Sequence, residues 1–331
     1  MPANLPPQYL RVKQRYSEAA TPEEKIECLQ EMLAIIPKHK GTEHLQTDLR
    51  KRLVTHRKEV QQAKKKGART SQSLDHIEKE GAGQAVLVGA SNTGKSSIVA
   101  ASTAADVQVA DYPFSTFRPA PGMMAYEDVQ VQLVDLPPVS RDYTESWVFN
   151  VIRNADLVLL TVDLSQPDPE EQVLDLTEIL EVHHLMLAGS RDVSSPNLST
   201  AVKPTLILAT KQDTPAAVAG LASLREAYAD EFPIFPLSVK SEQHLKQMSR
   251  RVFEALNLLR VYTKAPGKKP DLDQPYVLPV GSTVLDVAEA IHKDFAENLR
   301  FARIWGSEKY AGQQVKRDYV VEDRDILEIR I

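Results

Sequence analysis

Residues 85–97 read AVLVGASNTGKSS, and this stretch decides the fold of the region around it. The apolar run at residues 85–88 predicts a short, fully buried strand. It leads directly into residues 89–96, GASNTGKS, which match the phosphate-loop pattern, and residues 97–104 then favour a helix. A chance glycine-rich turn is the alternative, but the strand before the motif and the helix after it are the context that a phosphate loop requires. The sequence therefore predicts nucleotide binding here.

The residue types of this loop suit a phosphate chain. Glycines let the backbone curl so that successive N–H groups point at one anion, and a helix N-terminus adds its positive dipole end. Lys95 is expected to reach the β- and γ-phosphates, and the Ser96 hydroxyl to ligate Mg²⁺. The predicted contacts in the loop are Gly89, Ala90, Ser91, Asn92, Thr93, Gly94, Lys95, Ser96 and Ser97.

Length and composition set wider limits. The chain has 331 residues, of which 42% are hydrophobic, so two or three domains with ordinary cores are expected. The net charge of −5 gives no global sign of nucleic-acid binding. A single cysteine, Cys28, excludes a disulfide framework and a cysteine-based zinc site, and suits a reducing cytosol. With no apolar signal core and no stretch of membrane-spanning length, we expect a soluble, cytoplasmic protein without a membrane partner.

Composition divides the chain into three expected parts: a helical, partly basic arm (1–80), a nucleotide domain (81–262) and a small C-terminal domain (263–331). In the arm, apolar spacing predicts a helix over 23–36 and a long helix over 42–66. The long helix carries eight lysine and arginine residues against three acids. Such a run is either a solvated helix face or an arm that meets phosphate backbone or an acidic protein surface.

Strands and helices alternate through the middle part, which predicts a mainly parallel, doubly wound α/β sheet. The expected strands after the phosphate loop are 129–137, 155–165, 205–213 and 232–239, and the stretch 188–204 is expected to be a loop. Each strand ends in polar residues, at the carboxyl edge where ligands bind in such sheets.

Those strand ends hold the remaining chemistry. Asp135 is placed to hold Mg²⁺ through a water molecule. Asp213 follows Thr210-Lys211-Gln212, and its carboxylate can accept hydrogen bonds from N1–H and the 2-amino group of guanine. Adenine lacks this donor pair, so the motif favours GTP over ATP. The remaining predicted base contacts are Thr210, the Lys211 stem, and backbone groups at Ser238, Val239 and Lys240.

Residues 111–122, DYPFSTFRPAPG, resemble the first switch of the Obg/DRG GTPases. The resemblance implies that Thr116 senses Mg²⁺ and the γ-phosphate, next to Phe114 and Ser115 as nucleotide contacts. Residues 41–53 look like the helical segment that precedes the GTPase domain in DRG proteins, and residues 264–331 are similar to a TGS domain, a β-grasp module. An amphipathic helix expected over 285–291 fits that module. This resemblance implies a Ras-like P-loop GTPase domain and a ribosome- or RNA-associated function.

Departures from the family concern hydrolysis. The second-switch glycine is Pro138, which has no N–H to offer the γ-phosphate, and Val139 follows where other GTPases place a water-positioning glutamine. The segment between strands 155–165 and 205–213 is too short for the extra domain of eukaryotic DRG proteins. Asn92 matches the asparagine that helps to hold K⁺ in potassium-activated relatives, or else stabilises a turn.

The sequence thus predicts a slow GTPase switch with Lys95, Thr116 and Asn92 as its catalytic residues and Ser96, Thr116 and Asp135 around Mg²⁺. The alternatives are a degenerate GTPase that serves as a nucleotide-stabilised RNA or protein adaptor, and an enzyme that uses ATP. His183 and His184 are expected to pack or face water rather than bind metal, and Trp147 and Trp305 to anchor a core or domain interface.

Overall fold

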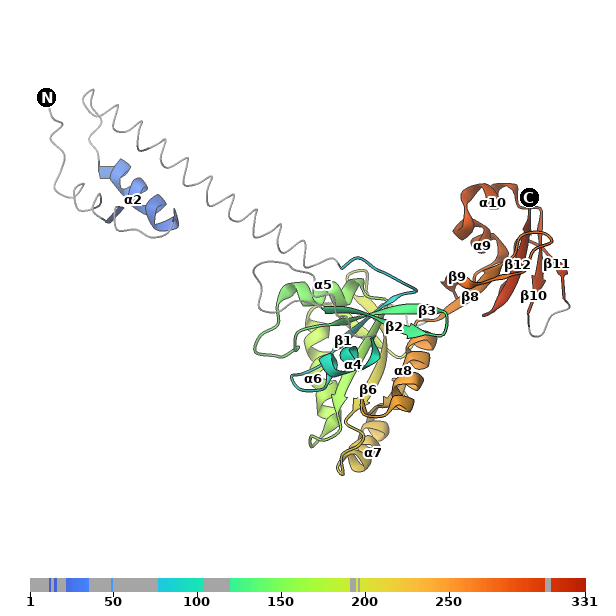
Figure 1. The fold of residues 1–331 in the computed structure, drawn as a ribbon. Helices are drawn as coiled ribbons and strands as arrows, with labels where there is room; N and C mark the ends of the chain where they lie inside the picture. The colour runs from blue at the N-terminus through green and yellow to red at the C-terminus, as the bar shows by residue number, and fades with distance from the viewer. Residues whose placement is uncertain are drawn as a thin grey trace, which may run out of the picture. The chain divides into compact units, whose positions relative to one another are not determined.

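The computed structural model describes residues 12, 15–16, 22–35, 49, 77–103, 120–190, 195, 197–306 and 311–331. Contacts divide the chain into two units, 1–74 and 75–331, each of which is described by itself. In the first unit, α2 (Pro22–Ile35) confirms the helix expected over 23–36 (Figure 1). Its buried residues Cys28, Leu29 and Met32 cluster with Val12 and Leu49. The helix expected over 42–66 lies outside the described residues, apart from Leu49.

The second unit begins with a seven-stranded sheet of order β2-β3-β1-β4-β6-β5, on which β7 also pairs with β6. All pairs are parallel except β2 with β3, so the predicted mainly parallel sheet is confirmed. The strands are β1 (Gln84–Val88), β2 (Ala120–Tyr126), β3 (Val129–Asp135), β4 (Leu157–Asp163), β5 (Leu185–Ala188), β6 (Ala201–Thr210) and β7 (Ile234–Pro236).

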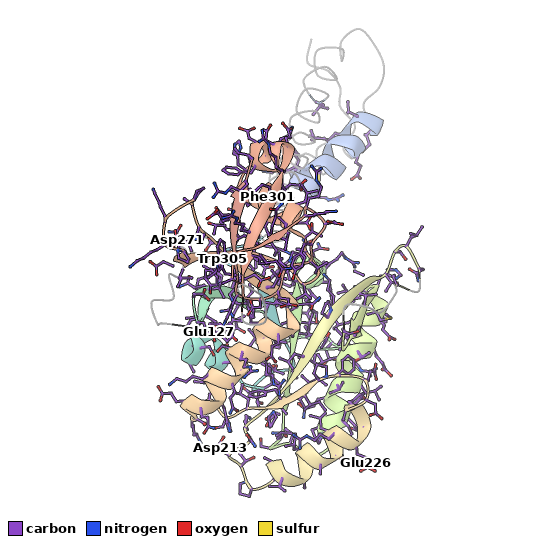
Figure 2. All side chains as sticks on the ribbon, turned by 90° about the vertical axis from the view of Figure 1, so that its right-hand side faces the viewer. Glu127, Asp213, Glu226, Asp271, Phe301 and Trp305 are labelled. Carbon is purple, nitrogen blue, oxygen red and sulfur yellow. The ribbon has the colours of Figure 1, made fainter. Side chains whose placement is uncertain are left out.

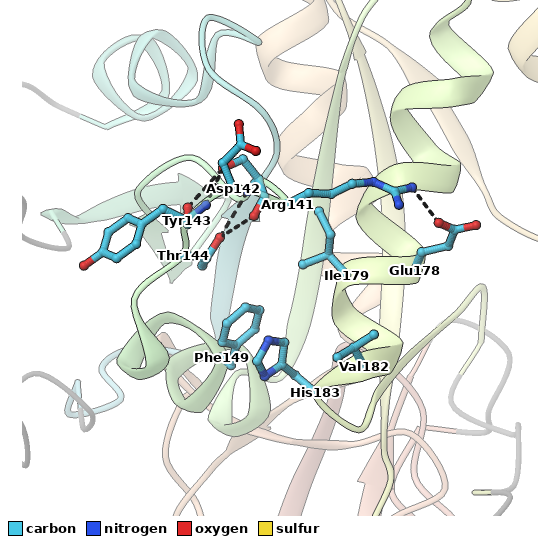
Figure 3. Close-up of a pocket in the computed structure, with 10 residues that line it drawn as sticks. Arg141, Asp142, Tyr143, Thr144, Phe149, Glu178, Ile179, Val182 and His183 are labelled. Atoms are coloured by element: carbon cyan, nitrogen blue, oxygen red, sulfur yellow. Dashed lines mark hydrogen bonds and ion pairs between the residues drawn. The ribbon is translucent and has the colours of Figure 1, made fainter.

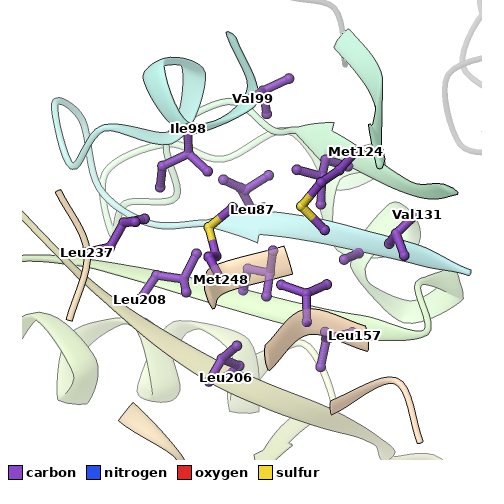
Figure 4. Packing of buried hydrophobic residues seen from close by; sticks show 14 of the residues in the cluster. Leu87, Ile98, Val99, Met124, Val131, Leu157, Leu206, Leu208, Leu237 and Met248 are labelled. Atoms are coloured by element: carbon purple, nitrogen blue, oxygen red, sulfur yellow. The ribbon is translucent and has the colours of Figure 1, made fainter. Parts of the chain in front are cut away.

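Five helices accompany this sheet in the described chain: α4 (Lys95–Ser102), α5 (Ser146–Asn154), α6 (Pro169–Val182), α7 (Ala217–Tyr228) and α8 (Glu242–Ala255). Helices α4 and α8 pack on one face, where Ile98 and Met248 meet Leu87 and Leu208 of the strands (Figure 4). Helix α6 contacts β4, β5 and α7. Burial of both the strands and these helix faces holds the phosphate loop on a rigid base.

The expectation of a loop over 188–204 is wrong at its end, because β6 already begins at Ala201. Pro204 reads as a loop signal in the sequence. In the structure it is the last β6 residue paired with β5, and pairing with β4 starts at Thr205. Strand β6 therefore changes partner at this position, and the proline lies at the end of the edge pairing, where it is tolerated.

A second sheet of order β11-β10-β12-β8-β9 forms the C-terminal part, with β12 parallel to β8. Its strands are β8 (Leu258–Thr263), β9 (Asp271–Pro279), β10 (Phe301–Trp305), β11 (Gln313–Val315) and β12 (Asp325–Arg330). Helix α9 (Val284–Ile291) confirms the amphipathic helix expected there, and the short α10 (Lys293–Asn298) follows it. Thr283 and Asp286 form a capping box at the start of α9, which fixes where the helix begins.

The two tryptophans lie in different environments. Trp147 on α5 is buried, with 5% of its surface exposed. Trp305 at the end of β10 is half-buried, and Lys264 Nζ lies 4.1 Å from its ring centroid (Figure 2). Trp147 therefore packs in a core, as expected, whereas the contact shown for the half-buried Trp305 is a cation–π pair with Lys264. Among the described residues, no helix combines the length and the apolar character needed to cross a bilayer.

Candidate nucleotide-binding site

The phosphate loop connects the buried strand β1 to α4. Gly94 adopts a left-handed conformation (φ 94°) directly before α4. In the part of the chain that the structure describes, no side chain caps the helix, so its first N–H groups are available to an anion. A Cβ at Gly89 would lie 2.2 Å from Thr161 Oγ1, so only glycine allows the loop to pass this close to β4. The local sequence thus builds an open anion site on a tightly packed base.

Lys95 is folded into this loop. Its ammonium donates hydrogen bonds to the carbonyl oxygens of Gly89 (2.9 Å) and Ala90 (2.7 Å), and 6% of the residue is exposed. Burial lowers the Lys95 pKa, while the charge of Asp135 opposes that shift. The Val139 N–H also donates to the Gly89 oxygen, at 3.2 Å. The carbonyl of Gly89 therefore holds both the lysine and the segment after Pro138 against the loop.

The oxygen atoms expected around Mg²⁺ lie together beside α4. Ser96 Oγ donates to Asp135 Oδ2 at 2.5 Å, and the second carboxylate oxygen, Oδ1, is buried and has no hydrogen-bond partner among the described residues. A buried carboxylate oxygen without a partner is costly unless a ligand or water satisfies it. Hydroxyl and carboxylate oxygens are the donors that Mg²⁺ prefers, so these two residues fit the ion.

The base-recognition residues gather at the ends of β6 and β7. Asp213 accepts hydrogen bonds from Ser238 Oγ (2.8 Å) and Lys240 Nζ (2.6 Å), and these bonds hold the pKa of its carboxyl below the usual range. Each carboxylate oxygen has a second lone pair, so Asp213 can still accept two bonds from guanine. Val239 lies in the turn between Ser238 and Lys240.

Thr210 joins the two halves of the site, because its hydroxyl lies 2.8 Å from the carbonyl oxygen of Thr93 in the phosphate loop. Two residues that the sequence did not single out support the same arrangement. Thr161 Oγ1 lies 2.8 Å from Thr93 Oγ1, and Asp163 Oδ2 accepts from Lys211 Nζ at 2.6 Å. Both come from β4, whose place beside β1 and β6 is a property of the sheet order and not of local sequence.

Asp163 is 3% exposed and charged in this arrangement. Burial opposes its ionisation, but hydrogen bonds from Lys211 and from Ser165 outweigh burial and hold the Asp163 pKa below the usual range. Lys211 itself adopts a left-handed backbone conformation (φ 57°), which directs its chain back toward β4. The lysine expected along the base is therefore tethered at its tip.

One cavity of about 750 Å³ lies between the phosphate loop, the segment that starts at Asp135, and Lys211. Its lining residues are Ser91, Asn92, Gly94, Lys95, Ser96, Ser97, Asp135, Leu136, Pro137, Pro138 and Lys211. Asn92, on the exposed side of the loop, has φ 63°, as an asparagine in a tight turn can. Phe114, Ser115 and Thr116 lie outside the described residues. The structure thus brings the predicted phosphate, metal and base residues to one edge of the sheet.

No group of three His, Cys, Asp or Glu side chains that could hold a metal ion occurs within the described ranges. His183 instead stacks on Phe149 of α5, with ring centroids 3.6 Å apart. This contact agrees with the packing role expected for the histidine pair.

Comparison with known proteins gives the same two parts. Residues 84–188 match a family model described as 50S ribosome-binding GTPase, and residues 259–331 match the TGS domain. An uncharacterized GTP-binding protein of Methanocaldococcus jannaschii is 29% identical over 367 residues, covering 93% of each chain. Developmentally-regulated G-protein 2 of Arabidopsis thaliana is 23% identical, covering 92% of this chain and 90% of its own.

Among solved structures, the YchF GTPase of Schizosaccharomyces pombe is similar with a TM-score of 0.50 at 15% identity. The match covers 77% of this chain and all of the other. The similarity concerns the fold, and it agrees with a nucleotide domain followed by a second, smaller sheet. The fold expected from the first-switch and C-terminal motifs is confirmed.

Proposed function

We propose that the chain is a slow GTPase switch of the developmentally-regulated G-protein type, because it matches a GTPase model and the TGS domain and resembles GTP-binding proteins over most of its length. The observation that carries the proposal is the pair formed by Ser96 and Asp135 beside the uncapped start of α4. A hydroxyl and a carboxylate with an unsatisfied oxygen at a helix N-terminus suit Mg²⁺ bound to a nucleotide phosphate chain.

In this proposal the chain's own groups divide the work. The first N–H groups of α4 and the Lys95 ammonium bind the phosphates, and Asp213 selects guanine. Ser96, and Asp135 through a water molecule, would hold Mg²⁺, which supplies charge neutralisation at the phosphate oxygens. We assign Thr116, which lies outside the described residues, to the γ-phosphate and Mg²⁺ by the resemblance of its segment to the first switch.

In this proposal, the segment after Asp135 limits the rate of GTP hydrolysis. Pro138 has no N–H, and the next N–H, that of Val139, donates to Gly89 O in this structure. To reach a γ-phosphate, the Val139 N–H has to leave Gly89, and Lys95 has to release the same carbonyl. These displaced bonds oppose closure of the second switch, and we therefore propose slow intrinsic hydrolysis. Asn92 is the candidate K⁺ contact.

We assign partner binding to RNA or the ribosome, through the TGS domain and the basic arm of residues 1–80. The GTPase family model is described by its ribosome binding, and the eight basic residues of segment 42–66 provide charge for a phosphate backbone. The test is single-turnover hydrolysis of GTP and ATP by the full chain, with and without ribosomes. We expect GTP alone to be cleaved, and faster with ribosomes.

A degenerate GTPase that acts as an adaptor is the second candidate, and the observation that favours it is Pro138 together with the Val139–Gly89 bond. An adaptor would bind GDP and a GTP analogue equally and would show no ribosome-stimulated turnover. The same assay therefore separates the two candidates.

Base selection gives a first prediction. Asp213→Asn replaces an acceptor by an amide donor that faces the donors of guanine, so we expect GDP affinity to fall by about tenfold or more. Xanthosine diphosphate carries a carbonyl oxygen where guanine has its 2-amino group, and the variant is expected to bind it better than wild type does. Fluorescence titration with labelled nucleotides measures both. Undiminished GDP binding would place the base elsewhere.

A further inference from the structure

A second hollow, of about 500 Å³, lies between the loop of residues 140–144 and α6 (Figure 3). Phe149 of α5 and Ile179, Val182 and His183 from the end of α6 line its apolar side. No residue is shared with the lining of the nucleotide cavity. The hollow is therefore separate from the nucleotide cavity, although Pro138 of that cavity and Ser140 of the hollow are only two residues apart in the chain.

Large apolar side chains face water around this hollow. Tyr143 on the loop is 72% exposed, Val182 at the end of α6 is 76% exposed, and Leu174 on α6 is 50% exposed. Tyr143 and Val182 line the hollow, whereas Leu174 lies outside its lining, about 80° around the helix from Val182 at 3.6 residues per turn. Three of the nine exposed large hydrophobic residues of the described chain thus occur on these two elements. Grouped exposure of this kind marks an interaction surface, whereas scattered exposure does not.

The charge of this surface is acidic. Helix α6 carries Glu170, Glu171, Asp175, Glu178 and Glu181 and no lysine or arginine. The loop contributes Asp142 and one cation, Arg141, which forms ion pairs with Asp175 (2.6 Å) and Glu178 (2.5 Å) of α6. Figure 3 shows the Arg141 side chain reaching across the hollow to Glu178. A phosphate backbone would be repelled here, whereas lysine and arginine side chains would be attracted.

We propose that this hollow is the docking site of a protein partner that presents a basic amphipathic helix. A bulky apolar residue of that helix enters between Tyr143 and Val182, and its lysines and arginines pair with Glu171 and Glu181 on the exposed face of α6. The mode is that of an amphipathic helix laid in a groove, with charge setting its orientation.

The experiment uses the full-length chain loaded with GDP. The probe is a fluorescein-labelled synthetic amphipathic peptide of leucine and lysine, and its counterpart of leucine and glutamate is the charge control. We expect the lysine peptide to bind with a measurable anisotropy change and the glutamate peptide not to bind. The double variant Tyr143→Ser, Val182→Ser is expected to weaken lysine-peptide binding by about tenfold or more, as loss of a central anchor does.

Val218→Ser is the matched control, because Val218 is an 80% exposed valine on α7, outside the hollow. It is expected to leave peptide binding unchanged, and the GDP affinity of every variant reports its folding. Glu171→Lys with Glu181→Lys is expected to weaken the lysine peptide and to admit the glutamate peptide. Equal lysine-peptide binding by wild type and the double variant overturns the proposal. The proposal is also overturned if the double variant binds a single-stranded RNA oligonucleotide more weakly than wild type does, because the surface would then be a nucleic-acid site.

Discussion

In the proposed site, Asp163 would act on the nucleotide through Lys211. Asp163 is buried, yet its carboxylate is charged and Oδ2 accepts a hydrogen bond from Lys211 Nζ at 2.6 Å. A lysine chain has about 2 kcal/mol of rotamer entropy to lose when it is ordered against a base. The tether meets part of this cost before the nucleotide binds, so Asp163 pre-orders one side of the base site.

We expect Asp163→Asn to raise the GDP dissociation rate by about three- to tenfold, because an amide holds the ammonium more weakly than a carboxylate does. GDP and GTP should be affected equally, since they share the base, and stopped-flow release of a fluorescent nucleotide measures both. Asp175→Asn, at an exposed carboxylate on α6, is the control and leaves both rates unchanged. A change confined to GTP would show that Asp163 acts on the phosphates instead.

Pro138 gives a prediction at the same scale. Pro138→Gly restores an N–H and frees the backbone, so a γ-phosphate gains a charge-assisted hydrogen bond without displacing Val139 from Gly89. We expect faster single-turnover hydrolysis or a stronger preference for GTP over GDP, by about tenfold for each 1.4 kcal/mol gained. Pro137→Gly, one residue earlier, is the matched control. If Pro138→Gly equals wild type in both measurements, the second switch works without this position.

Individual residues of the site differed in how far the sequence could predict them. Lys95 and Asp213 lie in motifs whose spacing carries the chemistry, and both are where the pattern places them. Thr161 and Asp163 could not be found in this way, because one threonine and one aspartate on a buried strand have no distinguishing pattern. Their contacts exist because β4 lies between β1 and β6, a neighbour relation that local sequence does not contain.

At the scale of elements, the turn between β2 and β3 connects the two sheets. Arg260 of β8 is fully buried and donates to Glu127 (2.5 Å) and Asp128 (2.7 Å) of that turn, and to Asp323 (2.7 Å) before β12. Its guanidinium carbon also lies 5.5 Å from the ring centroid of Tyr126. Burial disfavours the charged guanidinium, but the three carboxylates more than compensate and raise the Arg260 pKa.

Removal of this arginine leaves carboxylates facing one another across the contact. We expect Arg260→Met to lower the free energy of unfolding by about 3 kcal/mol, the lower end for a broken buried ion pair, because its partners are partly exposed. The midpoint of urea unfolding measures it. Arg324→Met is the control: Arg324 also donates to Glu127 at 2.5 Å but is 58% exposed, so we expect a change within about 1 kcal/mol. Equal effects of the two substitutions would contradict the role given to burial.

Elements with a local signal were predictable. Helix α9 begins at Thr283 with its capping box and has helical apolar spacing, and the helix expected there is present. Strands β2 and β5 were not foreseen. Ala120–Tyr126 contains a proline and a glycine, which read as loop signals, yet it pairs along its whole length with β3. Tertiary pairing overrode the local preference there.

At the scale of the whole second unit, the carboxylates described above predict how stability depends on pH. Hydrogen bonds from Arg260 and Arg324 lower the Glu127 pKa, and the pKa values of Asp128 and Asp163 are also lowered. A lowered pKa stabilises the folded state above the unfolded value of about 4, and that stability is lost as the pH falls through the folded pKa. We expect a thermal midpoint that is flat near neutrality and falls below about pH 4.

The loss of stability that we expect at alkaline pH has a separate cause. Burial and the hydrogen bond to Asp128 raise the pKa of Tyr262 to about 12. The sign is reversed for this group: its contribution is complete below the unfolded value of about 10 and is lost as the pH rises toward 12. We expect Asp128→Asn to reduce the fall of the thermal midpoint at both acidic and alkaline pH, which a calorimetric pH series measures. An unchanged fall in that variant would show that other groups cause the pH dependence.

The turn at Glu127 and Asp128 has one more consequence. The turn joins β2 to β3. Strand β2 starts at Ala120, within the segment expected to be the first switch, and β3 ends at Asp135 beside the phosphate loop. The same turn is bonded to Arg260 of the second sheet. If GTP and a ligand of the second sheet both favour one position of this hairpin, thermodynamic linkage requires that each raises the affinity for the other by the same factor. A partner of the TGS domain that prefers one hairpin position would then itself raise or lower the affinity for GTP, without touching the nucleotide.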